Sequence, residues 1–221
     1  MYLTKMETTN KKIAVLSIIN KINNNYEGFS ITDCFDRVYL YKKDFIPQYF
    51  NDKIIFISAK SFQQNHIILS KLIRNYTINL IKSEKEILCI GGESYIYGLC
   101  NDKTEIIYHY TNNINIYKDC EYNNKFYRKE IKNNYIDYNN KNLAIIPNIR
   151  VCLINLSTLT RNLINILNNN IYEKIIIISC HHDDFWKKIK NLTNYKLNKR
   201  EYFICYILGY FITVNIFIKI K

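Results

Sequence analysis

The sequence of 221 residues is long enough for one sizeable domain, or for a domain with a small extension. Hydrophobic residues make up 48% of it, which excludes wholesale disorder, and the counts of 5 Gly and 2 Pro exclude collagen-like and proline-rich classes. The net charge of +12 favours an anionic partner such as nucleic acid or a membrane surface. An AT-rich genome, which favours Lys, Asn, Ile and Tyr, explains the same charge equally well.

The first two thirds of the sequence predict strands and helices in alternation after a mixed start. A helix is expected over residues 61–80, because Phe62 and Leu69 begin a helical apolar spacing and Ser61 is a suitable N-cap. The predicted elements are a helix or strand at 13–22, strands at 37–41, 53–58, 86–90 and 106–109, and a helix at 114–123 inside a polar region at 111–142.

The last third predicts strands at 150–155 and 174–179, helices at 159–167 and 183–192, and a terminal hairpin. Strands without polar alternation, separated by helices, are typical of a parallel sheet that is covered on both faces. We therefore expect an α/β fold with a Rossmann-like sheet and a C-terminal antiparallel hairpin. The expected organisation is a small appendage at residues 1–50, which lack this alternation, and one domain at 51–221.

The apolar segment at 202–218 has two interpretations. Its length is near the lower limit for a membrane span, and Lys199-Arg200 and Lys219 flank it. However, it is rich in aromatic and β-branched residues, and Gly209 lies near its middle. These features favour two strands joined at 208–210 over a membrane anchor.

The cysteines are odd in number and form no C-x-x-C pair, so they indicate neither a disulfide framework nor a structural zinc site. Residues 1–5 contain no apolar signal core. Together these features predict an intracellular protein, cytoplasmic or nuclear rather than secreted. The seven cysteines are Cys34, Cys89, Cys100, Cys120, Cys152, Cys180 and Cys205.

Four residues are expected at the carboxyl ends of strands, where ligands bind in parallel sheets: Gly91, His109, Asn155 and Cys180. Cys180 precedes a predicted helix, whose N-terminus is expected to lower the thiol pKa towards the nucleophilic thiolate. The alternative is a buried apolar cysteine. A metal site at 180–184 is disfavoured, because adjacent residues cannot all converge on one ion.

Several segments, in order, resemble the S-adenosylmethionine-dependent 5-methyluridine RNA methyltransferases, which have the class I methyltransferase sheet. Residues 56–65 are similar to the family segment F-x-I-S-x-x-S-F-F-Q-x-N, and 176–180 to I-V-Y-V-S-C. Residues 119–123 resemble D-A-x-x-N, and 195–220 the closing strands. The resemblance implies S-adenosylmethionine as cofactor and RNA as partner. It also implies cofactor contacts from Gln64, Gly91 and Gly92, substrate binding by Asn155, and Cys180 as the nucleophile that adds to a flipped uracil.

The chain also departs from the family pattern, chiefly at its acidic positions. In the loop after the first strand, Glu93 and Tyr95 are expected to crowd the path of a nucleotide. The sequence therefore predicts a diverged, shortened relative that has lost catalysis or replaced these groups; a non-catalytic basic module that binds RNA or a protein is the alternative. The family's expected acids fall on Cys89, Thr111, Asn155 and, for the proton-abstracting glutamate, Phe217.

Overall fold

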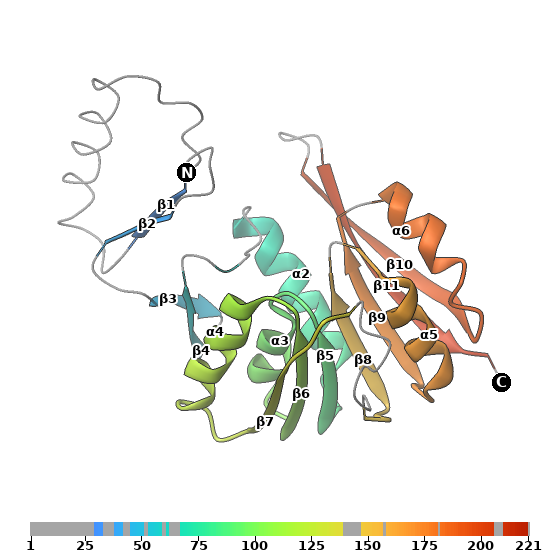
Figure 1. The fold of residues 1–221 in the computed structure, drawn as a ribbon, viewed down its shortest axis with the longest axis horizontal. Coiled ribbons are helices and arrows are strands. Elements are labelled where there is room, and N and C mark those ends of the chain that lie inside the picture. The colour runs from blue at the N-terminus through green and yellow to red at the C-terminus, as the bar shows by residue number, and fades with distance from the viewer. Residues whose placement is uncertain are drawn as a thin grey trace. The chain divides into compact units, whose positions relative to one another are not determined.

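Figure 1 shows the computed structural model of the chain. The structure describes residues 29–32, 38–41, 45–50, 53–58, 61, 67–138, 147–156, 158–180, 182–205 and 210–220. The chain divides into two compact units, residues 1–61 and 62–221, and each is described by itself. The division into an appendage at 1–50 and a domain at 51–221 stays a prediction, and the element expected at 13–22 lies outside the described residues.

The first unit contains two antiparallel strand pairs. Strand β1 (Phe29–Thr32) pairs with β2 (Val38–Tyr41), and β3 (Phe45–Phe50) pairs with β4 (Lys53–Ser58). The strands predicted at 37–41 and 53–58 are thereby confirmed. Pro47 lies within β3, which is compatible with a two-stranded sheet because only one side of each strand has to donate hydrogen bonds.

The second unit is built on a seven-stranded sheet with the order β10-β11-β9-β8-β5-β6-β7. Five neighbouring strands run parallel: β5 (Glu86–Ile90), β6 (Ile106–Thr111), β7 (Glu130–Tyr135), β8 (Val151–Asn155) and β9 (Lys174–Ser179). The closing hairpin of β10 (Tyr195–Cys205) and β11 (Tyr210–Lys219) joins them, with β11 antiparallel to both β10 and β9. The predicted α/β fold with a C-terminal antiparallel hairpin is confirmed.

The helices of the second unit cover both faces of this sheet. They are α2 (Ile67–Leu80), α3 (Ser94–Cys100), α4 (Ile114–Asn124), α5 (Arg161–Asn169) and α6 (His182–Ile189). In β5, Leu88 belongs to the hydrophobic cluster that contains residues of α5 and α6. Its neighbour Ile87 lies against Gly98 of α3. Successive residues of a strand point to opposite faces, so α3 packs on the face opposite α5 and α6 (Figure 1).

The apolar segment at 202–218 forms parts of β10 and β11, which confirms the hairpin interpretation; its predicted turn at 208–210 lies largely outside the described residues. None of the helices in the described part of the chain is long and apolar enough to span a membrane. The helix predicted at 61–80 is described only from Ile67 onward, so its cap at Ser61 stays a prediction.

Four described elements are missing from the sequence prediction: β1 and β3 of the first unit, and β7 and α3 of the second. Strand β7 lies at the edge of the sheet and buries Ile131 while most of its other side chains are polar, so it carries no apolar signal. Helix α3 is buried over Ser94–Leu99 and contains Gly98, so that neither amphipathic spacing nor composition marks it as a helix. Burial on all sides removes the periodicity from which helices are predicted.

Candidate functional site

The sharp turn after β5 is held by two glycines with positive φ, Gly91 at 71° and Gly92 at 44°. A side chain on Gly91 would place its Cβ 2.1 Å from Cδ2 of Leu156, and one on Gly92 would lie 2.7 Å from the carbonyl oxygen of Asn155. The Gly91 amide donates a hydrogen bond to the carbonyl of Tyr110 at 2.7 Å. Both glycines are therefore required by packing against the loop after β8. Their predicted contact with a cofactor stays a prediction.

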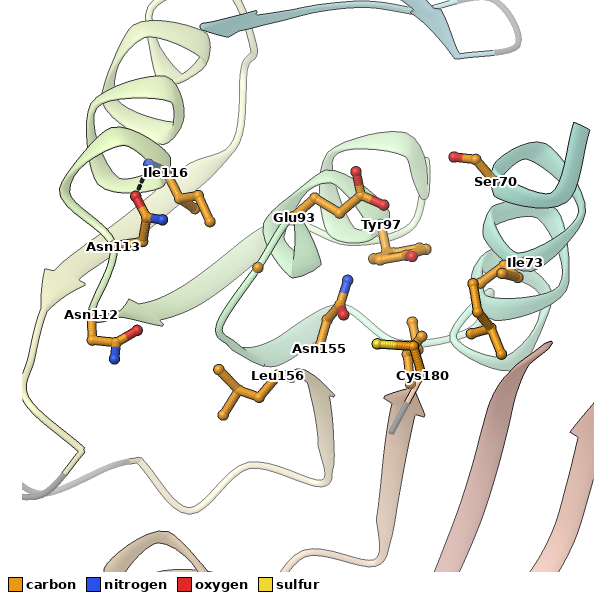
Figure 2. Close-up of a pocket in the computed structure, with 13 residues that line it drawn as sticks. Ser70, Ile73, Glu93, Tyr97, Asn112, Asn113, Ile116, Asn155, Leu156 and Cys180 are labelled. Carbon is orange, nitrogen blue, oxygen red and sulfur yellow. Dashed lines mark hydrogen bonds between the residues drawn. The ribbon is translucent and has the colours of Figure 1, made fainter. Parts of the chain in front are cut away.

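A pocket with a volume of about 290 Å³ lies where β5, β6, β8 and β9 end (Figure 2). It brings together three of the predicted site residues: Gly92, Asn155 and Cys180. Gly91 is not among the lining residues, and Gln64 lies outside the described residues. The lining residues are Ser70, Ile73, Gly92, Glu93, Tyr97, Asn112, Asn113, Ile116, Asn155, Leu156, Ile178, Cys180 and Ile212.

Glu93 lies inside this pocket and is 7% exposed. Its Oε2 atom is buried without a hydrogen-bond partner. Burial raises the pKa of the carboxyl group, and the positive charge of Arg74 lowers it by a smaller amount. The expectation that Glu93 crowds the path of a nucleotide stays a prediction. The residue adds to the pocket an ionisable group that the family resemblance does not assign.

Tyr95 lies outside the pocket, so the prediction that it crowds a nucleotide is wrong. Helix α3 begins at Ser94 and turns the tyrosine into the core, where its ring centroid lies 5.1 Å from that of His109. Its hydroxyl accepts a hydrogen bond from Nδ2 of Asn123 at 3.4 Å.

His109 also differs from the prediction, because β6 continues to Thr111 and the histidine lies inside the strand. It is fully buried, and its Nδ1 is 2.7 Å from Oδ1 of Asn133. Burial lowers the pKa of the imidazole to about 4 and keeps it neutral. His109 is therefore a core residue rather than a group at the carboxyl edge.

Cys180 follows the last residue of β9 and faces the pocket (Figure 2). The residue as a whole is exposed, yet the protein around its sulfur raises the thiol pKa; a hydrogen bond from backbone lowers it by less. The predicted lowering of this pKa by the following helix is thus wrong, because loss of water around the sulfur is the larger effect. Cys89 and Cys152 are fully buried, and burial raises their thiol pKa values as well.

The asparagine side chains at the pocket differ in whether they bond to the protein backbone or face the pocket. The Oδ1 atom of Asn113 caps α4 by accepting hydrogen bonds from the backbone amides of Asn115 and Ile116, at 2.9 and 3.3 Å. Asn155 stands at the end of β8, half-buried, with its amide at the pocket wall (Figure 2). Its position is suited to a hydrogen bond with a ligand. Ser70 and Asn112 also line the pocket, and no local sequence pattern identifies them.

A buried core residue, Phe217, stands where the sequence resemblance places the proton-abstracting glutamate. Phe217 of β11 is 4% exposed and belongs to the main hydrophobic cluster, opposite Ile175 of β9. Among the described residues that line the pocket, Glu93 is the one carboxylate. In the described part of the chain, no three His, Cys, Asp or Glu side chains are grouped closely enough to hold a metal ion.

No protein-family model matches the sequence, and a search of the curated proteins finds no match. Solved structures do match. The Pyrococcus abyssi tRNA (uracil-54, C5)-methyltransferase in complex with S-adenosyl-L-homocysteine is similar, with a TM-score of 0.70 at 14% identity. The match covers 88% of this chain and 51% of that one. The fold of this chain is the class I methyltransferase fold.

Two structures from M. jannaschii extend this finding. The tRNA m1G37 methyltransferase matches with a TM-score of 0.66 at 13% identity, over 87% of this chain and 63% of that one. TYW2 in complex with AdoMet matches with a TM-score of 0.58 at 12% identity, over 86% and 94%. This chain thus spans about half the length of the Pyrococcus enzyme. The likeness shows the fold and does not single out 5-methyluridine chemistry.

The class I methyltransferase fold explains where the pocket lies. The order of the strands reverses beside β5, which has β6 on one side and β8 on the other. Open parallel sheets bind ligands at such a switch point, at the carboxyl ends of their strands. The pocket, with the glycine turn on one wall and Asn155 on another, occupies this place.

Proposed function

We propose that this chain binds S-adenosylmethionine in the carboxyl-edge pocket and acts as an RNA methyltransferase-like protein. The observation that carries the proposal is the convergence of the glycine turn, Asn155 and Cys180 on one pocket at the switch point of a class I methyltransferase sheet. Two of the similar structures contain such a ligand: the Pyrococcus abyssi enzyme is a complex with S-adenosyl-L-homocysteine, and TYW2 is a complex with AdoMet.

The lining residues suit such a ligand in size and chemistry. A volume of about 290 Å³ is near the lower end of the range for small-molecule sites, roughly 300 Å³ upward. Ile73, Ile116 and Leu156 supply apolar surface, while Asn112 and Asn155 supply amides for the edges of a nucleoside. The unpartnered Oε2 of Glu93 leaves an acceptor for a ligand donor.

RNA as the partner is supported by charge and by exposed aromatic side chains. The net charge is +12, and among the cations Lys125 lies over the ring of Tyr122, 5.8 Å from its centroid. The neighbouring Phe126 is 55% exposed. Cations beside exposed aromatic rings suit phosphate contacts and base stacking.

As the specific reaction we propose methyl transfer to C5 of uracil with Cys180 as the nucleophile. When bound, S-adenosylmethionine supplies the sulfonium methyl group. The Cys180 thiolate would add to C6 of the uracil, so that C5 attacks that methyl group and S-adenosylhomocysteine leaves. Because Phe217 stands where the resemblance expects the base, solvent water would accept the C5 proton as the C6–S bond breaks to regenerate the thiolate. The raised pKa of Cys180 means that only a small fraction is thiolate at neutral pH.

A second candidate function is RNA binding without catalysis. The observation that favours it is Phe217, buried in the core at the position where the resemblance expects the proton-abstracting glutamate. A chain that binds RNA but neither binds the cofactor nor transfers its methyl group has this second function.

The test is isothermal titration calorimetry of the full chain with S-adenosylmethionine, followed by transfer of a labelled methyl group to RNA. We expect binding that stabilises the protein against heat and weakens in Asn155→Ala. Absence of heat and of a thermal shift at millimolar cofactor contradicts the cofactor proposal. Methyl transfer that persists in Cys180→Ala contradicts the uracil mechanism, and RNA affinity that is indifferent to salt contradicts the RNA proposal.

A further inference from the structure

Among the described residues that line the pocket, Glu93 is the one with a fully buried side-chain oxygen that has no hydrogen-bond partner. The side chain is 7% exposed, and its Oε2 is buried without a partner. A buried acceptor without a donor costs folding free energy, and a buried negative charge without a counter-charge costs more. A residue that imposes this cost at the wall of a pocket is explained if a ligand supplies the missing donor.

We propose that the Glu93 carboxylate recognises a positively charged group of the bound cofactor and thereby selects a cationic ligand. The inference rests on the proposed function, because it takes S-adenosylmethionine as the occupant of the pocket. It assigns a specificity-determining role to a residue that, from the sequence, is only an obstacle.

The charges around Glu93 support a cationic rather than an anionic occupant. No Lys, Arg or His is among the described residues that line the pocket. Arg74 of α2 attracts the carboxylate, but burial is the larger effect on its pKa, and the guanidinium donates a hydrogen bond to Oγ of Ser70 at 2.8 Å. Tyr97 remains a neutral phenol, since burial and the charge of Glu93 both raise its pKa. A ligand cation therefore meets a buried carboxylate whose charge Arg74 offsets only in part.

S-adenosylmethionine has two candidate groups with the required charge, the sulfonium and the amino-acid ammonium. S-adenosylhomocysteine retains the ammonium and lacks the sulfonium, while 5′-methylthioadenosine has neither charge. These three ligands share the adenosine part, so a comparison among them reports on charge recognition rather than on nucleoside binding.

The experiment is calorimetric titration of wild type, Glu93→Gln and Glu105→Gln with the three ligands. Glu93→Gln keeps the size of the side chain and removes its charge. Glu105→Gln makes the same change at an exposed carboxylate, with its side chain 66% exposed and 3.5 Å from Lys85. Circular dichroism and thermal unfolding of both variants check that the fold is retained.

We expect Glu93→Gln to bind S-adenosylmethionine about 10- to 100-fold more weakly than wild type, the size of a lost hydrogen bond to a charged group. Its affinity for 5′-methylthioadenosine and all affinities of Glu105→Gln stay unchanged. An equal loss for S-adenosylhomocysteine assigns the ammonium, and a loss for S-adenosylmethionine alone assigns the sulfonium. Unchanged or tighter binding of S-adenosylmethionine by Glu93→Gln overturns the inference while leaving the proposed function intact. A wild type that binds none of the three ligands overturns both.

Discussion

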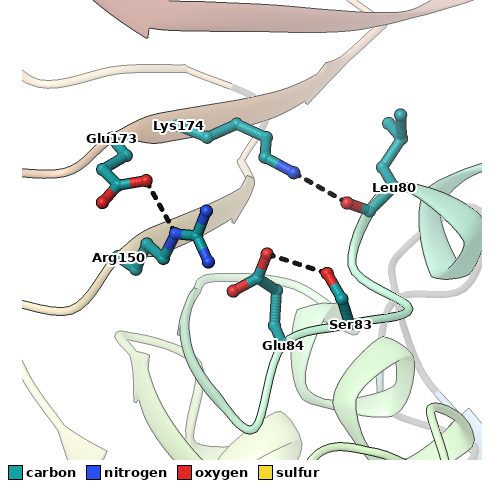
Figure 3. A network of polar contacts seen from close by, with 6 residues as sticks. All are labelled: Leu80, Ser83, Glu84, Arg150, Glu173 and Lys174. Atoms are coloured by element: carbon teal, nitrogen blue, oxygen red, sulfur yellow. Dashed lines mark hydrogen bonds and ion pairs between the residues drawn. The ribbon is translucent and has the colours of Figure 1, made fainter.

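The polar side chains at the two edges of the central sheet differ in whether the protein itself supplies their partners. At the amino edge, Nζ of Lys174 donates to the carbonyl of Leu80 at 2.8 Å, and Arg150 forms an ion pair with Glu173 at 2.6 Å (Figure 3). At the carboxyl edge, around the pocket, Glu93 and Asn155 face a space that they do not fill (Figure 2). At the amino edge, polar side chains are paired with other groups of the protein. At the carboxyl edge, polar side chains line a pocket and are available to a ligand.

Two glutamates make the contrast precise, because they are buried almost equally. Glu84, before β5, is 6% exposed, and Glu93, after β5, is 7% exposed. Glu84 accepts a hydrogen bond from Oγ of Ser83 at 3.4 Å (Figure 3). Its negative charge is also one of the causes that raise the pKa of Arg150. Glu93 keeps an unpartnered oxygen and a raised pKa. The same residue type at the same burial is therefore structural at one end of a strand and available to a ligand at the other.

The largest effect is expected from Gly91→Ala. The substituted residue would have to keep a φ of 71° with its Cβ 2.8 Å from the carbonyl oxygen of Asn155, besides its clash with Leu156. The left-handed conformation and the overpacking together cost about 3 kcal/mol of unfolding free energy, measured by urea titration. Gly98→Ala is the comparison, because Gly98 has no positive φ and the atoms nearest to its added Cβ are side-chain atoms of Ile87 and Ile107 rather than backbone. Equal losses in both variants would show that the glycine turn is not a strained feature of the carboxyl edge.

Asn101→Ala tests the amino edge. The Nδ2 atom of this buried residue donates to the carbonyl of Ile81 at 2.8 Å and to Oγ1 of Thr104 at 2.7 Å. Its removal takes two hydrogen bonds out of a buried network, although the Ile81 carbonyl still accepts from the Glu84 amide and Thr104 still donates to the Glu84 carbonyl. The unfolding free energy is expected to fall by about 2 kcal/mol, with ligand affinity unchanged. Asn155→Ala is expected to do the reverse, with weaker binding and little loss of stability. A large loss of stability in Asn155→Ala would remove the distinction between the two edges.

Glu93 is expected to make the stability of the protein depend on pH. Because the folded-state pKa of Glu93 is raised, the folded protein binds more protons than the unfolded chain between the ordinary value of 4.5 and the raised one. The contribution of Glu93 to stability is therefore lost as the pH rises through this window. Urea titrations at a series of pH values should show Glu93→Gln gaining on wild type as the pH rises. A stability difference between Glu93→Gln and wild type that stays constant over this pH range would contradict the expectation.

The smallest effect on stability is expected from Cys180→Ala, about 0.5 kcal/mol or less, because the residue is exposed. In the folded wild type, iodoacetamide should modify Cys180 before the buried Cys89 and Cys152. The rate should rise above neutral pH, since the thiol pKa is raised. Peptide mass mapping after short exposure measures the order of modification. Modification of Cys89 before Cys180 would contradict the expected order of accessibility. Unfolding of Cys180→Ala would show that Cys180 contributes to the core.

Much of the fold is predictable from the sequence because the central strands are buried on both faces. Such strands are unbroken apolar runs, as in the Ile-rich β9, and their alternation with helices predicts a parallel sheet. The order of Gly91, Asn155 and Cys180 along the chain likewise predicts that they approach one edge, and the structure places Asn155 and Cys180 in one pocket. The prediction fails for β7 and α3, which lack the periodicities of half-buried elements.

The sequence by itself determined which residues follow the strands, and therefore which edge holds the pocket. Only the tertiary structure decided what those residues experience there. Tyr95 turns into the core while Glu93, two residues before it, faces the pocket, and the sulfur of Cys180 loses enough water to raise its pKa. These properties depend on desolvation and on neighbours from distant segments, such as Ser70 and Asn112. Local spacing contains no information about such neighbours, so the chemistry of the pocket follows from packing rather than from the order of residues.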